Sequence, residues 1–155
     1  MYSTISYGSA RIYICCMNIF LKNENGIDER LRVFILDDCK IIREKIKEHL
    51  LLKNDVVIVG EAESKKDGME LIAEFNPDVV FLDIKLRDEN GLSVLIDLKR
   101  TRPMIKVVMF SNSADPYYKR KFRECGCDYF LDKSKDFSMI SGVIDEIVLL
   151  RTKSI

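Results

Sequence analysis

The chain of 155 residues carries no excess of charge of either sign. Lysine plus arginine and aspartate plus glutamate both number 25, so no net field points to nucleic acid or an anionic membrane surface as an obligatory partner. Low-complexity tracts and internal repeats of fixed period are also absent. The length suits about one domain with a hydrophobic core, and it leaves little room for a second folded module.

The sequence also lacks the even, regularly spaced cysteines of a small secreted domain. An odd number of cysteines without such a framework favours a reducing, cytoplasmic environment. The five are Cys15, Cys16, Cys39, Cys125 and Cys127. The last two are best interpreted as thiols that fill small apolar spaces. A thiolate metal site that joins them to the first two is conceivable, but the spacing matches no standard zinc pattern.

No hydrophobic run is long enough to cross a bilayer, and we expect no membrane partner. The only candidate targeting feature is RIYICCMNIFL at residues 11–21, which is well short of the ~20 apolar residues of a transmembrane helix and lacks a small-residue cleavage pattern. We interpret residues 1–30 as an N-terminal extension that is frayed or packs weakly, with a polar linker at 22–30. A native start at Met17 is a further hypothesis.

From residue 31 onward, short apolar runs alternate with amphipathic helical patterns. The runs LRVFIL, VVIVGEA, PDVVFLD, IKVVMF and DYFL each precede a helical segment, which makes five β-α units. In the first of these segments, Ile42, Ile46 and Leu50 share one helix face. Continuous apolar strands are typical of a parallel sheet with both faces covered. The pattern predicts an α/β fold over 31–155, a three-layer sandwich with a five-stranded parallel sheet flanked by five helices.

Polar residues follow the predicted strands at the point where each one ends. Asp37 and Asp38 end the first strand, Asp83 the third and Ser111 the fourth, while Lys133 lies just past the fifth. In an open parallel α/β sheet these positions meet at one edge, where ligands bind. Three carboxylates gathered there repel one another unless a cation is present. Mg²⁺ suits such a place, because it binds one or two carboxylates and keeps positions for phosphate oxygens.

With a hydroxyl and an ammonium group nearby, this set indicates a phosphoryl-transfer site with an aspartate nucleophile. Each feature taken singly also has a structural interpretation. An acidic pair after a strand commonly caps a helix, a lone serine can do the same, and a lone lysine is usually a surface residue. The interpretation as a site depends on their occurrence together in a matching structural context.

The segments that carry these residues resemble the receiver domain of two-component response regulators, over residues 31 to about 150. They are VFILDD, VVFLDIKLRDENGLSVL, VVMFSNS and CGCDYFLDKS, in the order and spacing of that family. The resemblance implies a flavodoxin-like sheet of strand order 2-1-3-4-5. It also implies that the phosphodonor is a phosphohistidine on a histidine kinase or a histidine phosphotransferase. The single histidine, His49, is interpreted as a surface residue of the first helix.

The same resemblance implies a role for each residue near the acids. Asp38 would bind Mg²⁺ directly and Asp37 mainly through water. Asp83 would be the phosphoacceptor, with its carboxylate also touching the metal. The backbone carbonyl of Lys85 would be a third protein ligand.

Three more positions resemble the family's switch residues. Ser111 corresponds to the hydroxyl that turns toward the phosphoryl group, Phe130 to an aromatic rotamer switch, and Lys133 to the lysine that bridges to a phosphoryl oxygen. For Phe130, plain packing is the alternative. Phosphorylation would bias a two-state arrangement of the fourth helix, the fifth strand and the fifth helix.

That face of the predicted domain is a candidate partner site. It carries aromatic and basic residues, namely Tyr117, Tyr118, Arg120 and Arg123, and a solvated helix face is nearly as good an interpretation. We expect a stand-alone receiver that binds an unknown downstream protein there, without direct contact to nucleic acid, as a monomer or weak homodimer.

Three positions depart from the family pattern. Arg87 stands where the loop after the phosphoacceptor often has a proline, so its turn is expected to be looser. Asn112 follows the switch hydroxyl where a very small residue is usual, and its bulk would narrow the access of water to the phosphoacceptor. Ser134 replaces a frequent proline after Lys133, so the peptide bond there need not be cis.

Two other classes of function stay open. A metal-dependent α/β phosphohydrolase would use the same acids, but such enzymes usually have a second acid two residues after the nucleophile, where Lys85 stands here. A receiver-like scaffold that is never phosphorylated would not need the complete acidic set. We therefore expect a signalling domain that catalyses only its own phosphorylation and dephosphorylation, and not an enzyme acting on external substrates.

Overall fold

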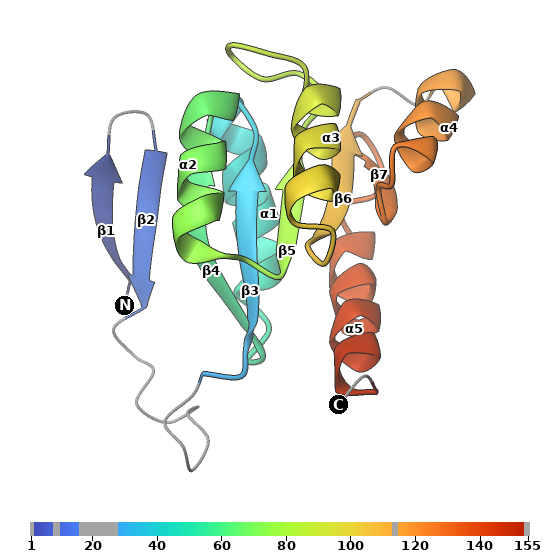
Figure 1. Cartoon of the computed structure of the whole chain (residues 1–155). Helices are drawn as coiled ribbons and strands as arrows, with labels where there is room; N and C mark the ends of the chain where they lie inside the picture. The colour runs from blue at the N-terminus through green and yellow to red at the C-terminus, as the bar shows by residue number, and fades with distance from the viewer. Residues whose placement is uncertain (1, 8–9, 16–27, 113–114, 154–155) are drawn as a thin grey trace.

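The computed structural model describes residues 2–7, 10–15, 28–112 and 115–153. These residues form strands and helices that alternate over most of the chain (Figure 1). The elements in chain order are β1 (Tyr2–Tyr7), β2 (Ala10–Cys15), β3 (Leu31–Leu36), α1 (Lys40–Leu50), β4 (Val56–Ala62), α2 (Lys65–Phe75), β5 (Val79–Leu82), α3 (Gly91–Thr101), β6 (Lys106–Ser111), α4 (Pro116–Glu124), β7 (Tyr129–Asp132) and α5 (Met139–Thr152).

Five of the described strands are parallel and lie in the order β4-β3-β5-β6-β7. Numbered along the predicted domain, this is the order 2-1-3-4-5, so the predicted flavodoxin-like topology is confirmed. The register aligns the strand ends: Leu36 of β3 is paired with Leu82 of β5, and Ser111 of β6 with Asp132 of β7. Residues that follow these strands therefore reach the same edge of the sheet.

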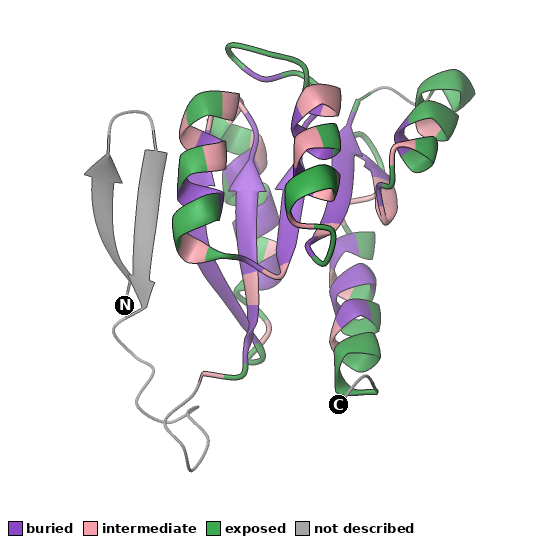
Figure 2. Cartoon of the chain, in the orientation of Figure 1, coloured by how far each residue is buried: buried purple, intermediate pink, exposed green. Residues whose placement is uncertain are grey.

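Helices cover both faces of the parallel sheet, which confirms the three-layer arrangement. On one face, α2, α3 and α4 pack on alternate strand residues such as Phe34. On the other face, α1 and α5 pack on the residues between them, such as Ile35. The strands are buried between the two layers (Figure 2). Because both faces are covered, the strands can be apolar without a break, as the sequence shows.

An antiparallel hairpin, β1–β2, extends the sheet beyond its parallel part, and the sequence did not predict it. Strand β2 lies beside β4 with Arg11 opposite Glu61, so the described strands form one sheet of seven. The hairpin covers an edge that would otherwise present unpaired backbone groups. Met17, the hypothetical native start, lies outside the described residues.

Helix starts follow the expected side-chain chemistry at three places. Ser64, Asn90 and Asp115 cap α2, α3 and α4 by accepting a hydrogen bond from a backbone amide in the first turn.

Among the described helices, none combines the length and the apolar character that crossing a membrane requires.

Gly91 begins α3 directly behind the end of β5. A Cβ atom at this position would lie 2.0 Å from the backbone oxygen of Asp83, which cannot move away as a flexible side chain can. The position therefore requires glycine for close approach of two backbone segments, one of which carries a predicted site residue.

We predict that Gly91→Ala lowers the free energy of unfolding by about 2–3 kcal/mol, because the added methyl group overpacks a backbone contact. The matched control is Gly142→Ala in α5, where an added Cβ meets nothing within 4 Å and should stabilise the helix by about 0.5–1 kcal/mol. Urea denaturation of both variants measures the difference. Equal stability of Gly91→Ala and the wild type would show that an added methyl group does not overpack the backbone at Asp83.

Candidate functional site

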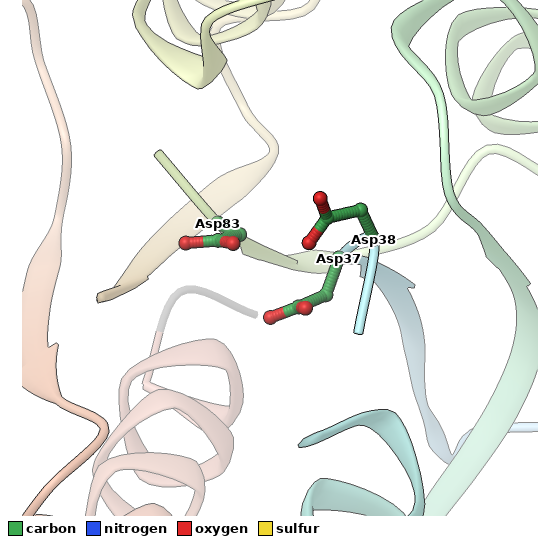
Figure 3. Close-up of side chains that lie close together, drawn as sticks. All are labelled: Asp37, Asp38 and Asp83. Atoms are coloured by element: carbon green, nitrogen blue, oxygen red, sulfur yellow. The ribbon is translucent and has the colours of Figure 1, made fainter. Parts of the chain in front are cut away.

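The three predicted acids meet at the carboxyl edge of the sheet. Asp37 and Asp38 follow β3 and Asp83 follows β5, and one oxygen of each carboxylate lies within 4.8 Å of the others. Figure 3 shows the three side chains gathered in one place. Asp37 and Asp83 are buried, whereas Asp38 is half-buried. The structure thus brings Asp83 next to the acidic pair Asp37 and Asp38, which lies far from it along the chain.

Lys133 reaches the same place from the end of β7. Its Nζ atom lies 2.6 Å from Oδ2 of Asp37 and 2.9 Å from Oδ2 of Asp83. The ammonium group is buried together with both carboxylates, so one positive charge lies at contact distance from two negative charges and compensates them only in part. Removal of Lys133 would leave two buried carboxylates facing each other.

Burial and mutual repulsion shift the protonation equilibria of the site. Burial raises the pKa of Asp37 to about 6, against the attraction of Lys133 and with a further rise caused by Asp83. Burial also raises the pKa of Asp83, although Lys133 opposes this change. For Lys133, burial alone would lower the pKa, but the two carboxylates hold it above its usual value. The acids are therefore poorly compensated by one ammonium group alone.

The donor set fits a hard divalent cation such as Mg²⁺. Three carboxylates offer oxygen atoms on one side of the edge, and oxygen is the ligand that Mg²⁺ requires. The buried Oδ2 atom of Asp37 accepts no hydrogen bond of regular geometry despite its ion pair with Lys133. A cation would compensate this charge, so the site has both the ligands and an electrostatic reason to hold one.

Ser111 and Phe130 lie on the neighbouring strands β6 and β7. Ser111 is buried at the end of β6, and its carbonyl oxygen accepts a hydrogen bond from the amide of Lys133. Phe130 is half-buried and its ring centroid lies 6.0 Å from that of Phe122 on α4. The Nζ atom of Lys119 lies 5.5 Å from the Phe130 ring centroid. Phe130 therefore connects the strand beside the site to helix α4.

The three residues that depart from the family pattern are all exposed, namely Arg87, Asn112 and Ser134. Every described peptide bond is trans, so the bond between Lys133 and Ser134 is not cis, as expected. Lys85 is exposed and pairs with Asn90 in an isolated β-bridge, which places the loop backbone directly after Asp83 in a closed turn.

Arg43 of α1 is a site residue that sequence reasoning missed. Its guanidinium is buried, and Nη1 donates a 2.7 Å hydrogen bond to the backbone oxygen of Asp37, while Nη2 donates to Oε1 of Glu63 at 2.8 Å. Arg43 also lies close to the buried Glu61. One signal was present in the sequence, because Arg43 shares the buried helix face of Ile46 at a spacing of three residues.

The cysteines do not form a described metal centre. Cys125 and Cys127 are free thiols that flank Gly126, whose φ of 93° favours glycine at the end of α4. Burial raises the pKa of Cys127 to about 11, which suits an inert thiol. Cys16 and the side chain of Cys15 lie outside the part of the chain that the structure describes.

The predicted partner face contains exposed aromatic residues. Tyr117 and Tyr118 are exposed on α4 and their rings contact each other edge to face. Arg120 is exposed and pairs loosely with Glu124 one turn later, and Arg123 is exposed as well. The structure therefore places these side chains at the surface of α4, the helix whose Phe122 contacts Phe130.

The sequence profile of the response regulator receiver domain family matches residues 33–145. The transcriptional regulatory protein DegU of Brevibacillus brevis is 29% identical over 114 residues, which cover 74% of this chain and 48% of that protein. The sensory transduction protein LytT of Bacillus cereus is 35% identical over 101 residues, which cover 65% of this chain and 41% of that protein.

Solved structures agree with this assignment. A DNA-binding response regulator of the LuxR family from Staphylococcus aureus has a TM-score of 0.70 and 26% identity, over 76% of this chain and 98% of that one. The receiver domain of the response regulator NarL from Mycobacterium tuberculosis has a TM-score of 0.70 and 27% identity, over 77% and 97% of the two chains.

The chain spans about half the length of the curated relatives that it matches. The matching profile, however, covers most of the chain, and the solved receiver domains agree with its parallel sheet. The chain belongs to the response regulator receiver domain family of two-component signalling proteins.

Proposed function

We propose that this receiver domain accepts a phosphoryl group on Asp83 from a phosphohistidine, in a reaction that depends on Mg²⁺. The observation that carries the proposal is the arrangement around Asp83. Its carboxylate is buried at the strand edge, lies 2.9 Å from the Lys133 ammonium group and shares one small space with Asp37 and Asp38. These are the components that an aspartate nucleophile needs for phosphoryl transfer.

The proposed step forms one bond and breaks another. A carboxylate oxygen of Asp83 bonds to phosphorus while the bond between phosphorus and the donor imidazole nitrogen breaks. The imidazole nitrogen keeps the electron pair and takes up a proton. The Lys133 ammonium group would form an ion pair with one phosphoryl oxygen. The hydroxyl group of Ser111 would donate a hydrogen bond to another phosphoryl oxygen.

Mg²⁺ would be held by Asp37, Asp38, Asp83 and the backbone carbonyl of Lys85. When bound, it would neutralise charge on the phosphoryl oxygens as the new bond forms. The carboxylates of Asp37 and Asp38 would then bind and orient the cation. Burial of the site would limit the access of water to the acyl phosphate.

The proposed output is a change in binding at the α4, β7 and α5 face. A phosphoryl group would draw Ser111 toward the site, and the ring of Phe130 would follow into the vacated space. The contact between this ring and Lys119 supports the idea that α4 responds. A downstream protein would read the exposed face of Tyr117, Tyr118, Arg120 and Arg123.

The proposal includes the expected boundaries and partners. Residues 31–155 would act as the receiver, with residues 1–30 as an accessory extension, and a cytoplasmic histidine kinase or histidine phosphotransferase would supply the phosphoryl group. A stand-alone monomer or weak homodimer without direct nucleic-acid contact stays a prediction. Relatives named as transcriptional or DNA-binding regulators make a test with DNA a useful addition.

Incubation with Mg²⁺ and a phosphorylated histidine phosphotransferase should add one base-labile phosphate to the wild type and none to Asp83→Asn. Intact mass measurement detects the adduct. Asp55→Asn is the matched control, because Asp55 is an exposed acid near the N-terminal end of β4 and should leave labelling unchanged. Turnover of a free phosphoester without a covalent adduct would instead favour a phosphohydrolase.

Asp37→Asn should stabilise the metal-free protein near neutral pH. A pKa raised from 3.8 to about 6 means that the ionised form destabilises the fold, by an amount on the order of 3 kcal/mol above pH 6. This destabilisation is absent below pH 3.8, and it should be roughly half as large at pH 5. The increase in the free energy of unfolding caused by Asp37→Asn should therefore become smaller as the pH falls.

Urea denaturation in the presence of EDTA, at neutral pH and at about pH 5, measures this increase in stability. Asp55→Asn is again the control. Mg²⁺ should stabilise the wild type, since the cation favours the ionised carboxylates, and should stabilise Asp37→Asn much less. A variant that is less stable than the wild type at every pH would show that Asp37 stabilises the metal-free fold through Lys133.

Asn112→Ala should speed loss of the phosphoryl group by a few fold. The smaller side chain would admit water to the acyl phosphate more readily, because the exposed Asn112 directly follows Ser111, the buried last residue of β6. The decay of phosphorylated protein, followed by mass or by release of phosphate, measures the rate. An unchanged rate of decay and unchanged labelling by acetyl phosphate would remove Asn112 as a barrier.

A further inference from the structure

The loop between β5 and α3 has a compact structure of its own. Lys85 and Asn90 form a β-bridge, and inside it the amide of Leu86 donates a 3.0 Å hydrogen bond to the carbonyl of Glu89. The Leu86 side chain is buried in the core, so the turn is anchored from within. The tip of the loop extends over α2 (Figure 1). We call residues 85–90 the docking loop.

The docking loop caps helix α2 from outside that helix. Oδ1 of Asp88 accepts a 2.7 Å hydrogen bond from the amide of Lys65, and Oδ2 accepts one of 3.2 Å from the amide of Lys66. Ser64, the N-cap residue, accepts from the next amide, that of Asp67. The first amides of a helix lack partners within the helix, and here a distant carboxylate binds two of them, at the end of the helix that favours negative charge.

Glu63 provides a second attachment, directly before α2. The amide of Arg87 donates a 3.2 Å hydrogen bond to the backbone oxygen of Glu63, and the guanidinium of Arg87 pairs with its carboxylate. The same carboxylate accepts from the buried Arg43, which also donates to the backbone oxygen of Asp37. A continuous set of hydrogen bonds thus runs from the docking loop to the acidic pair.

These contacts restrict the conformation of the loop non-covalently, as a proline ring would restrict it covalently. Arg87 stands at the position where the family often has proline, and a non-proline residue leaves φ free. A loop with several conformations would present the Lys85 carbonyl in the right place for only part of the time, and the apparent metal affinity falls by that fraction. The contacts at Asp88 and Arg87 oppose this loss.

We propose that Asp88 and Arg87 are positioning residues that fix the docking loop on the N-terminus of α2 and so place the Lys85 carbonyl for Mg²⁺. The inference rests on the proposed function, because it assumes that the acids and this carbonyl hold the cation. Asp88 lies outside the group of acids that could hold the cation, so it would act through the backbone of the loop.

The test compares Asp88→Ala, Asp88→Asn and Glu70→Ala by two measurements. Amide hydrogen exchange reports the capping contact, and calorimetric titration with Mg²⁺ reports its consequence. In Asp88→Ala the amides of Lys65 and Lys66 should exchange at least about tenfold faster, and the Mg²⁺ dissociation constant should rise on the order of tenfold. Glu70→Ala removes a charge from the exposed side of the same helix and should change neither.

Asp88→Asn separates positioning from charge, because it keeps an oxygen that can accept from the Lys65 amide but loses the negative charge. Recovery of a large part of the Mg²⁺ affinity in Asp88→Asn supports positioning, whereas equal weakening in both variants would overturn it in favour of a charge effect. Saturating Mg²⁺ should also restore the phosphorylation rate of Asp88→Ala, since its reacting groups are intact.

Mg²⁺ binding by the wild type separates failure of the proposed function from failure of the positioning role. Absence of Mg²⁺ binding by the wild type would remove the proposed function, and the positioning role with it. Normal binding by the wild type together with unchanged affinity of Asp88→Ala, despite faster amide exchange, would overturn the positioning role alone.

Discussion

Repulsion among buried carboxylates is the constraint on which the rest of this structure depends. The parallel topology brings Asp37, Asp38 and Asp83 to one strand edge, and burial denies two of them the solvent that would otherwise screen their charge. Lys133 compensates part of this charge through contacts with Asp37 and Asp83. Burial, with a smaller contribution from the charge of Asp83, raises the pKa of Asp37 to about 6 against the attraction of Lys133. The site is therefore suited to receive a cation.

The surroundings of the acids divide into two halves with different physical character. On the side of α1 and α2, buried Arg43 connects the Asp37 backbone to Glu63, and the docking loop is tied to the helix N-terminus. On the side of β6, β7 and α4, the contacts run through side chains such as Phe130 and Lys119. A loop that places a metal ligand has to be held rigidly, as the hydrogen bonds on the first side do. A switch between two states needs side chains that can repack, as Phe130 and Lys119 on the second side can.

The hairpin β1–β2 adds a feature outside the common parallel sheet. Strand β4 would be the edge of the parallel part, and β2 pairs with it near Glu61. Glu61 is buried and lies 3.0 Å from Lys47 of α1, so a charged cluster sits beneath this edge. The buried ion pair needs both partners, because removal of either would leave an uncompensated charge. The accessory strands thus join the domain next to α1, the helix that carries Arg43.

The sequence alone determined the layer architecture and the convergence of the acids, because strand periodicity, strand order along the chain and position at a strand end are local properties with a known consequence in parallel sheets. The tertiary structure decided what depends on contacts between distant segments. Lys133 bridges Asp37 and Asp83, and Asp88 caps a helix that begins 23 residues earlier. Neither pairing has a periodic signal, since each depends on how loops fold back across the edge. The attachment of the hairpin to the sheet was missed for a similar reason, because the pairing of β2 with β4 joins segments separated by the whole of β3 and α1.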